Sequence, residues 1–313
     1  KMKRHLVRGG FQVPFFQLVQ NTTEIIKVWD EWESEKIIIK PTDRSGARGV
    51  SIISQGNDIK DAFDDAIINS NIREVIIEEF VEGPQISTET ILFNGKSLTP
   101  GFADRVYDTT LSFYPHVIEN GGWIPSILPK EQIKKIKELV ENASKYIGIN
   151  KGTAKGDVVI HPKKGPMIIE IAARLSGGDF CESLVPLSSG VNYVKDAIKI
   201  SLGEPPNWES LNPSKGFVVA NRYFFLPEGK LEKIINLDEA RLMNGIEKLE
   251  LFIKEGDLIS RINSHANRIG VFIVKSTSRK KVQSIINAVY KKVIFKVDGS
   301  WITGNPLLYP SQN

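Results

Sequence analysis

Residues 156–178 read Gly156-Asp-Val-Val-Ile-His-Pro-Lys-Lys-Gly-Pro-Met-Ile-Ile-Glu-Ile-Ala-Ala-Arg-Leu-Ser-Gly-Gly178. Two apolar runs, each carrying one carboxylate, flank a turn with Pro and Gly, and this pattern predicts two antiparallel strands. If the loop comprises residues 162–165, His161 opposes Pro166, and the residue numbers of opposed pairs sum to 327. Asp157 then faces Glu170.

Carboxylates that face each other across two strands repel unless a cation lies between them. Hard oxygen ligands at this separation suit Mg²⁺. A shift of one residue in the register would instead point Asp157 and Glu170 to opposite faces. The pair therefore predicts a metal site on condition that the register is as counted.

A guanidinium and a turn of small residues follow Glu170 directly. The guanidinium of Arg174 is suited to a bidentate hold on a carboxylate or phosphate. Ser176, Gly177 and Gly178 form the turn. An ordinary ion pair followed by a turn is the alternative interpretation.

Two further stretches suggest nucleotide chemistry. Lys40 ends an apolar run, and the loop Ser45-Gly46-Ala47-Arg48-Gly49 follows it. Glycines let a backbone approach phosphate oxygens, and successive amides can form an anion-binding nest, although a plain hairpin turn also fits. The second stretch, Glu78-Glu79-Phe80-Val81, ends an apolar run and is followed by Gly83-Pro84. It can be interpreted as a hinge lined with acceptors or as a strand end with solvated charges.

Length and composition limit the number of domains and the classes of protein that fit this sequence. The chain has 313 residues, with 41 Lys and Arg against 37 Asp and Glu, for a net charge of +4. The length suggests two domains, and the apolar runs are far shorter than the ~20 residues of a membrane span. Cys181 is the single cysteine, so a cytoplasmic, reducing compartment fits best. The basic clusters are short, and we expect no nucleic-acid partner.

Periodicity predicts a mixture of helices and strands. Helical spacing marks residues 21–32, 58–69, 130–147, 191–202 and 279–291. Apolar or alternating runs mark strands at 36–40, 50–53, 74–80, 86–93, 97–103, 156–161, 167–171, 217–225, 248–253, 268–275 and 293–297. The segment 203–214, rich in Pro, Asn and Ser, is the predicted domain boundary.

The order of these motifs along residues 1–205 resembles the ATP-grasp family. Residues 168–178 look like the family's Mg-binding strand and the turn after it. Residues 117–126, Val-Ile-Glu-Asn-Gly-Gly-Trp-Ile-Pro-Ser, are similar to a segment of its carboxylate–amine ligase branch. The resemblance implies an α+β fold in which two α+β lobes (about 15–100 and 101–205) sandwich ATP, with a C-terminal α+β domain at 206–313.

The resemblance also implies roles for individual residues. The ATP contacts would be Lys40, Ser45, Gly46, Ala47, Gly49, Glu78, Glu79, Phe80, Val81 and Gln85. Asp157 and Glu170 would hold Mg²⁺. Arg174 would act catalytically by steadying the transferring phosphoryl group. The substrate contacts would be His116, Glu119, Ser176, Gly177 and Gly178.

The implied activity is ATP-dependent ligation of a carboxylate to an amine, including amino acids, or to a thiol. An acylphosphate forms, and ADP and phosphate are released. A carboxylase-like or purine-pathway enzyme and a nucleotide-binding scaffold without turnover are the alternatives. The expected partners are small carboxylates and amines, with no membrane. The C-terminal domain would either cover the active site or form a homodimer contact.

The chain departs from the family's pattern at three points. Gln85 stands where the family commonly has Glu, and its amide oxygen can still accept a hydrogen bond. Ala172 stands where Asn is frequent, which leaves the number of Mg²⁺ ions open. The family carries a Rossmann-like domain and a nucleotide-contacting lysine before the position of Lys1, so the sequence is expected to lack an N-terminal part.

Overall fold

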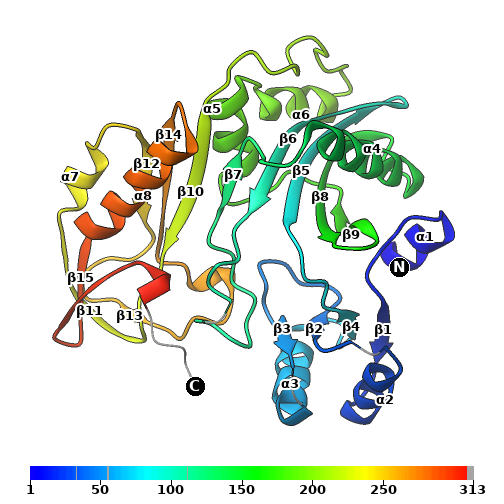
Figure 1. Cartoon of the computed structure of the whole chain (residues 1–313), viewed down its shortest axis with the longest axis horizontal. Coiled ribbons are helices and arrows are strands. Elements are labelled where there is room, and N and C mark those ends of the chain that lie inside the picture. Colours follow the sequence, from blue (N-terminus) through cyan, green and yellow to red (C-terminus); the bar gives the residue numbers. More distant parts are fainter. Residues whose placement is uncertain (33, 55, 111, 309–313) are drawn as a thin grey trace.

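The computed structural model describes residues 1–32, 34–54, 56–110 and 112–308. It has the predicted α+β character, with a four-stranded sheet, an eight-stranded sheet and a second four-stranded sheet (Figure 1). The last residues of the predicted C-terminal domain, 309–313, lie outside the described residues. No described helix combines the length and the apolar character needed to cross a membrane.

The first sheet forms a small lobe near the N-terminal end. Its antiparallel strands lie in the order β1-β4-β2-β3: β1 (Phe16–Val19), β4 (Val75–Glu79), β2 (Ile37–Pro41) and β3 (Ser51–Ile53). Alternate residues of β2 are buried, as expected for a sheet with one covered face. Helices α2 (Thr22–Trp32) and α3 (Ile59–Asn69) supply that cover, and both were predicted from helical spacing.

The central sheet is continuous across the predicted domain boundary. Its order is β12-β14-β10-β7-β6-β5-β8-β9. The strands nearest the small lobe are β5 (Gln85–Phe93), β6 (Lys96–Arg105), β7 (Gly122–Ile124), β8 (Lys151–His161) and β9 (Gly165–Ala172). The others are β10 (Val218–Phe224), β12 (Ile246–Leu251) and β14 (Gly270–Ser276). Strands from both sides of residues 203–214 are therefore hydrogen-bonded into one sheet, through β7 and β10.

Helices cover both faces of this sheet, and α1 (Met2–Arg8) contacts β9 at its edge. Helix α4 (Lys130–Tyr146) packs its apolar stripe on β5, β6, β8 and β9. A π-helical turn (Phe180–Leu184), α5 (Val185–Ser189) and α6 (Tyr193–Ser201) bury a second apolar cluster.

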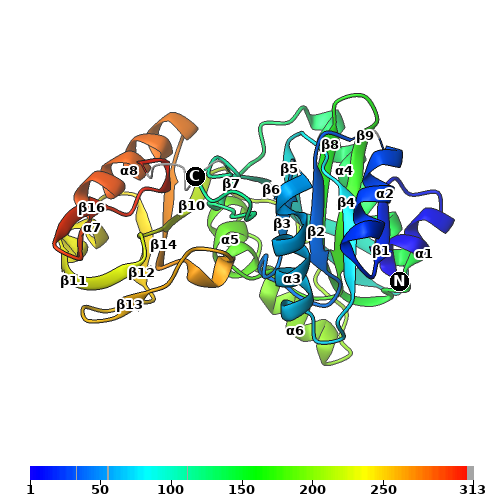
Figure 2. The ribbon, with the colours of Figure 1, turned by 90° about the horizontal axis from the view of Figure 1, so that it is seen from below.

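The third sheet lies in the C-terminal part, with α8 (Arg279–Lys292) and α7 (Leu237–Arg241) beside it. Its order is β13-β11-β15-β16: β13 (Leu258–Ile259), β11 (Gly229–Ile235), β15 (Ile294–Val297) and β16 (Ser300–Thr303). An aromatic cluster joins it to the central sheet: contacting rings lie 5.0–5.7 Å apart among Phe224, Phe272, Tyr290 and Phe295. Figure 2 shows this part at the opposite end of the molecule from α1.

The register of β8 and β9 corrects one prediction and confirms another. The turn has three residues, not four, because His161 pairs with Gly165 and Ile160 with Pro166. Near the turn the opposed numbers thus sum to 326. An irregularity between Asp157 and Val158 restores the predicted sum, so Asp157 does pair with Glu170. The predicted pair is correct because a bulge compensates for the shorter turn.

Candidate functional site

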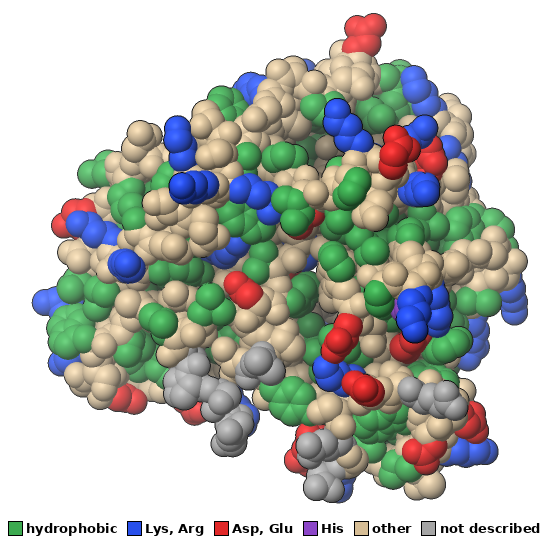
Figure 3. Space-filling model, in the orientation of Figure 1, with side chains coloured by type: hydrophobic (Ala, Val, Ile, Leu, Met, Phe, Trp, Pro, Cys, Tyr) green, Lys and Arg blue, Asp and Glu red, His purple; other side chains and the backbone are tan. Residues whose placement is uncertain are grey.

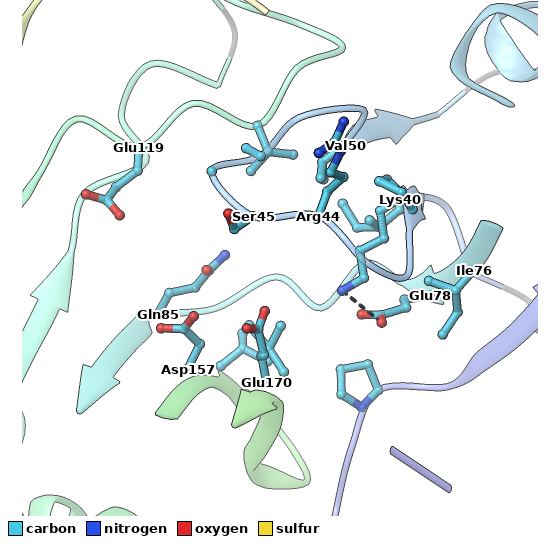
Figure 4. A pocket seen from close by; sticks show the side chains of 18 of the residues that line it. Lys40, Arg44, Ser45, Val50, Ile76, Glu78, Gln85, Glu119, Asp157 and Glu170 are labelled. Carbon is cyan, nitrogen blue, oxygen red and sulfur yellow. Dashed lines mark ion pairs between the residues drawn. The ribbon is translucent and has the colours of Figure 1, made fainter. Parts of the chain in front are cut away.

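A cavity of about 770 Å³ lies where the small lobe meets the central sheet. In the space-filling view the surface is hollowed there (Figure 3). All the residues predicted for the site line this cavity except Gly49 and His116. Figure 4 shows Lys40, Glu78, Gln85, Asp157 and Glu170 directed toward a common space.

Gly49 and His116 lie outside the cavity lining. Gly49 has a φ of +67°, and a Cβ there would lie 2.9 Å from the Asn69 Cβ, so this glycine lets the loop pack on α3. His116 forms an isolated β-bridge with Ser51 and is partly buried, and burial lowers its pKa. Both residues therefore contact the small lobe, and their predicted roles in binding stay predictions.

A buried carboxylate between two lysines lies at the small-lobe end. The Glu78 carboxylate accepts ion pairs from the ammonium groups of Lys3 and Lys40, each at 2.8 Å. Burial lowers the pKa of Lys3 to about 8, although Glu78 opposes the change. Burial alone would raise the pKa of Glu78, but the two lysines hold it below its usual value. Two positive charges and one negative charge thus lie together at the small-lobe end of the cavity.

The predicted hinge, Glu78 to Val81, is followed by Gly83 and Pro84, which pass against Ile160 of β8. The Ile160 N–H donates to the Pro84 carbonyl at 3.0 Å. A Cβ on Gly83 would lie 2.1 Å from the Ile160 carbonyl oxygen, so only glycine fits this crossing. The Glu79 N–H donates to the Phe15 carbonyl, which fixes the hinge to the entry of the small lobe.

Alternate residues of the paired strands form the cavity floor. Gln85 and Ser87 on β5, Lys155 and Asp157 on β8, and Glu170 on β9 all line it. The Ser87 hydroxyl donates to Asp157 at 2.5 Å, and Lys155 forms an ion pair with the same carboxylate. Burial would raise the pKa of Asp157, but Lys155, Ser87 and Arg105 together hold it below its usual value.

This donor set fits Mg²⁺. Asp157 and Glu170 are register partners, and Gln85 offers an amide oxygen beside them. Among the described residues, no group of three or more His, Cys, Asp or Glu could hold a metal. A magnesium ion at this pair would therefore take its remaining ligands from phosphates and water, as Mg²⁺ commonly does.

At the other end of the cavity one carboxylate lies between two guanidinium groups. The Arg105 Nη2 is 2.6 Å from Glu119 Oε2, and the Arg268 Nη2 is 3.7 Å from Glu119 Oε1. The Nε and Nη1 of Arg105 and the Nε of Arg268 are buried without a hydrogen-bond partner in the described structure. Tyr107 and Tyr223 also line this end, and burial raises the pKa of both hydroxyls.

His265 joins this end to the predicted phosphate loop. Its backbone N–H donates to the Gly46 carbonyl at 2.9 Å, and its Nε2 accepts the Glu119 N–H at 3.2 Å. Burial, with Arg268 and Arg105 nearby, lowers the pKa of His265 well below its usual value. A neutral imidazole therefore bridges the small lobe and the segment that carries Glu119.

The predicted turn after Arg174 is fixed by a hydrogen bond to Glu89 on β5. The Ser176 N–H donates to Glu89 Oε1 at 3.0 Å, and Glu89 is fully buried. Burial raises the pKa of Glu89 to about 7.

Sequence reasoning missed several lining residues. Lys155 was open to prediction, because it lies two residues before Asp157 and so on the same face of its strand. Tyr223, His265 and Arg268 come from the C-terminal part and reach the cavity only through tertiary packing, so no local pattern indicated them. Lys3 reaches the cavity from α1, outside the motifs that the sequence singled out.

A small lobe folded over the edge of a larger sheet, with a glycine loop opposite a carboxylate pair, is the arrangement of a nucleotide-binding protein. A model of the ATP-grasp domain matches residues 1–178, more than half of the chain, and the chain therefore belongs to the ATP-grasp family. A model of the L-amino acid ligase C-terminal domain 2 matches residues 222–298.

Individual relatives are distant. The Sinorhizobium fredii protein y4rH is 24% identical over 302 residues, which cover 93% of this chain and 59% of that protein. The chain thus spans about three fifths of this relative. The L-amino acid ligase from Bacillus licheniformis superposes with a TM-score of 0.77 at 19% identity, covering 93% of this chain and 70% of that one. The biotin carboxylase domain of the Hydrogenobacter thermophilus 2-oxoglutarate carboxylase was solved with MgADP and bicarbonate. It superposes with a TM-score of 0.70 at 17% identity, covering 94% of this chain and 65% of that one.

Proposed function

We propose that this chain is an ATP-dependent carboxylate–amine ligase that takes an amino acid as a substrate. The nucleotide would lie between Lys40, the loop of Ser45 to Ala47 and the hinge of Glu79 to Val81. Two findings support the assignment: the match of residues 222–298 to the L-amino acid ligase domain, and the charge pattern at the far end of the cavity.

That charge pattern is the observation that carries the proposal. Arg105 and Arg268 contribute two positive charges and Glu119 one negative charge, which leaves one net positive charge. His265 adds none, because its pKa lies well below the usual value. One surplus charge with unpartnered N–H donors fits a single carboxylate better than a phosphate dianion. Glu119 Oε1, which accepts no hydrogen bond in the described structure, fits an ammonium group.

The reaction would follow from placing these groups in one cavity. A substrate carboxylate attacks the γ-phosphorus of ATP, the bond to the bridging oxygen breaks, and ADP leaves. The amine then attacks the acylphosphate carbon and displaces phosphate. Lys40 and Arg174 would hold the phosphate oxygens through charge-assisted hydrogen bonds, and the Ser176–Gly178 turn would orient the acyl group. Asp157 and Glu170 would hold Mg²⁺, which neutralises phosphate charge when bound.

The experiment is ADP release by the protein with ATP, Mg²⁺ and pools of amino acids, with products identified by mass spectrometry. Adding hydroxylamine traps an acylphosphate as a hydroxamate. We expect ADP release that depends on amino acids, together with a dipeptide-like product. Release that depends on bicarbonate would favour the carboxylase-like alternative, and nucleotide binding without ADP release would favour a scaffold.

A matched pair of variants tests the charge pattern. Arg268→Met removes one guanidinium from the substrate end, and we expect the KM for the amino acid to rise at least tenfold, as for the loss of a charge-assisted hydrogen bond of about 1.5–3 kcal/mol. Arg261→Met, at an exposed position outside the cavity lining, should leave it unchanged. Nucleotide affinity serves as the folding control. Equal KM values for the two variants would contradict the assignment of the substrate end.

A further inference from the structure

Lys155 lies on the cavity floor, next to the carboxylate pair of Asp157 and Glu170. Its register partners are Glu89 on β5 and Ala172 on β9, and the next pair on the same face is Asp157 with Glu170. The ammonium therefore lies beside the carboxylate pair and lines the same cavity.

The surroundings of Lys155 hold its ammonium group in place. Its side chain is 15% exposed, and its ammonium is held by Asp157 rather than by solvent. Its register partner on β9 is Ala172, whose side chain is a methyl group, and such cross-strand partners lie about 5 Å apart. The side chain at position 172 thus offers no oxygen ligand.

We propose that the Lys155 ammonium supplies the second positive charge at the ATP phosphates, so that the site takes a single divalent cation. The proposal rests on the nucleotide-binding part of the proposed function. A second divalent ion would need oxygen ligands on the Lys155 side, and Asp157 is already held there by Lys155 and Ser87. The ammonium would also repel such an ion. Its three N–H donors suit phosphate oxygens.

The experiment counts Mn²⁺ ions bound per protein by equilibrium dialysis, in the presence of an ATP analogue with nitrogen between its β- and γ-phosphates. No amino acid is added. We expect one Mn²⁺ for the wild-type protein. In the double variant Lys155→Met with Ala172→Asn, the removed charge and the added amide oxygen should admit a second Mn²⁺. Lys155→Met alone should keep one ion and weaken analogue binding roughly tenfold to a hundredfold.

Lys151→Met is the matched control. Lys151 is exposed at the start of β8, lies outside the cavity lining and should change neither the ion count nor the analogue affinity. Circular dichroism checks that each variant is folded. Two ions in the wild-type protein, or one ion in a folded double variant, would overturn the proposal.

The number of bound Mn²⁺ ions tests the Lys155 proposal independently of the ligase assignment, because counting the ions requires no turnover. One ion together with no ligation of amino acids would refute the proposed function and leave the Lys155 inference standing. Two ions together with ligation would do the reverse. Absence of metal-dependent analogue binding would refute both.

Discussion

Replacing Glu89 by Gln should stabilise the protein at alkaline pH and have little effect at acidic pH. Glu89 is fully buried on β5, with Ser176 donating to its Oε1 and Tyr193, Cys181 and Lys155 as its polar or titratable neighbours. Burial raises its pKa from 4.5 to about 7, since these neighbours do not fully compensate the desolvated charge. Glutamine keeps the shape and a carbonyl acceptor for the Ser176 N–H but is never charged.

The size of the effect follows from the two pKa values. Because the folded-state pKa is the higher one, the folded protein binds more protons between pH 4.5 and about 7. Wild-type stability contributed by this group therefore falls as the pH rises through that window, and the loss is complete above it. At about 1.36 kcal/mol for each pKa unit, the loss is about 1 kcal/mol at pH 5 and about 3 kcal/mol at pH 8.

Urea unfolding followed by tryptophan fluorescence, at pH 5 and pH 8, measures the difference in the free energy of unfolding between the variant and the wild-type protein. The expected advantage of Glu89→Gln grows by about 2 kcal/mol between the two pH values. Glu138→Gln, on the exposed face of α4, is the control and should show no such growth. An advantage of Glu89→Gln that is equal at both pH values would refute the reasoning.

Two other substitutions test the packing around the site. Glu78→Gln leaves two lysine ammonium groups, each 2.8 Å from the lost carboxylate, without their partner, so we expect a loss of about 3–5 kcal/mol in urea unfolding. A loss below 1 kcal/mol would mean that the lysines find other partners. Gly121→Ala places a Cβ 2.1 Å from the Asn221 carbonyl oxygen at a φ of +101°, and should cost more than about 3 kcal/mol. At Gly95, with a φ of +83° and open space around it, the same change should cost only about 1–2 kcal/mol; equal costs would show that the close approach is unimportant.

The carboxylate pair was open to prediction because its residues lie on strands with a strong local pattern. Counting pairs outward from an assumed four-residue turn matched Asp157 with Glu170, and this pairing survived the wrong turn length only because a bulge added the missing residue. No local rule predicts such a bulge, so the register of a hairpin is known from sequence only to within one residue.

The substrate end was not open to prediction in the same way. Glu119 was singled out by resemblance, but its partner Arg268 is 149 residues away along the chain. Their pairing depends on how β10 and β14 join the central sheet, which is a tertiary event without a periodic signature. His116 was also singled out by resemblance, and the structure places it at a β-bridge with Ser51, outside the cavity lining.

The unbroken central sheet has a consequence for motion. Strands β12, β14 and β10 are hydrogen-bonded through β7 to β6, so the C-terminal part and the platform beneath Asp157 form one stiff body. We expect the cavity to open and close by movement of the small lobe, while the central sheet stays fixed. The bond from the His265 N–H to the Gly46 carbonyl would then break whenever the small lobe opens.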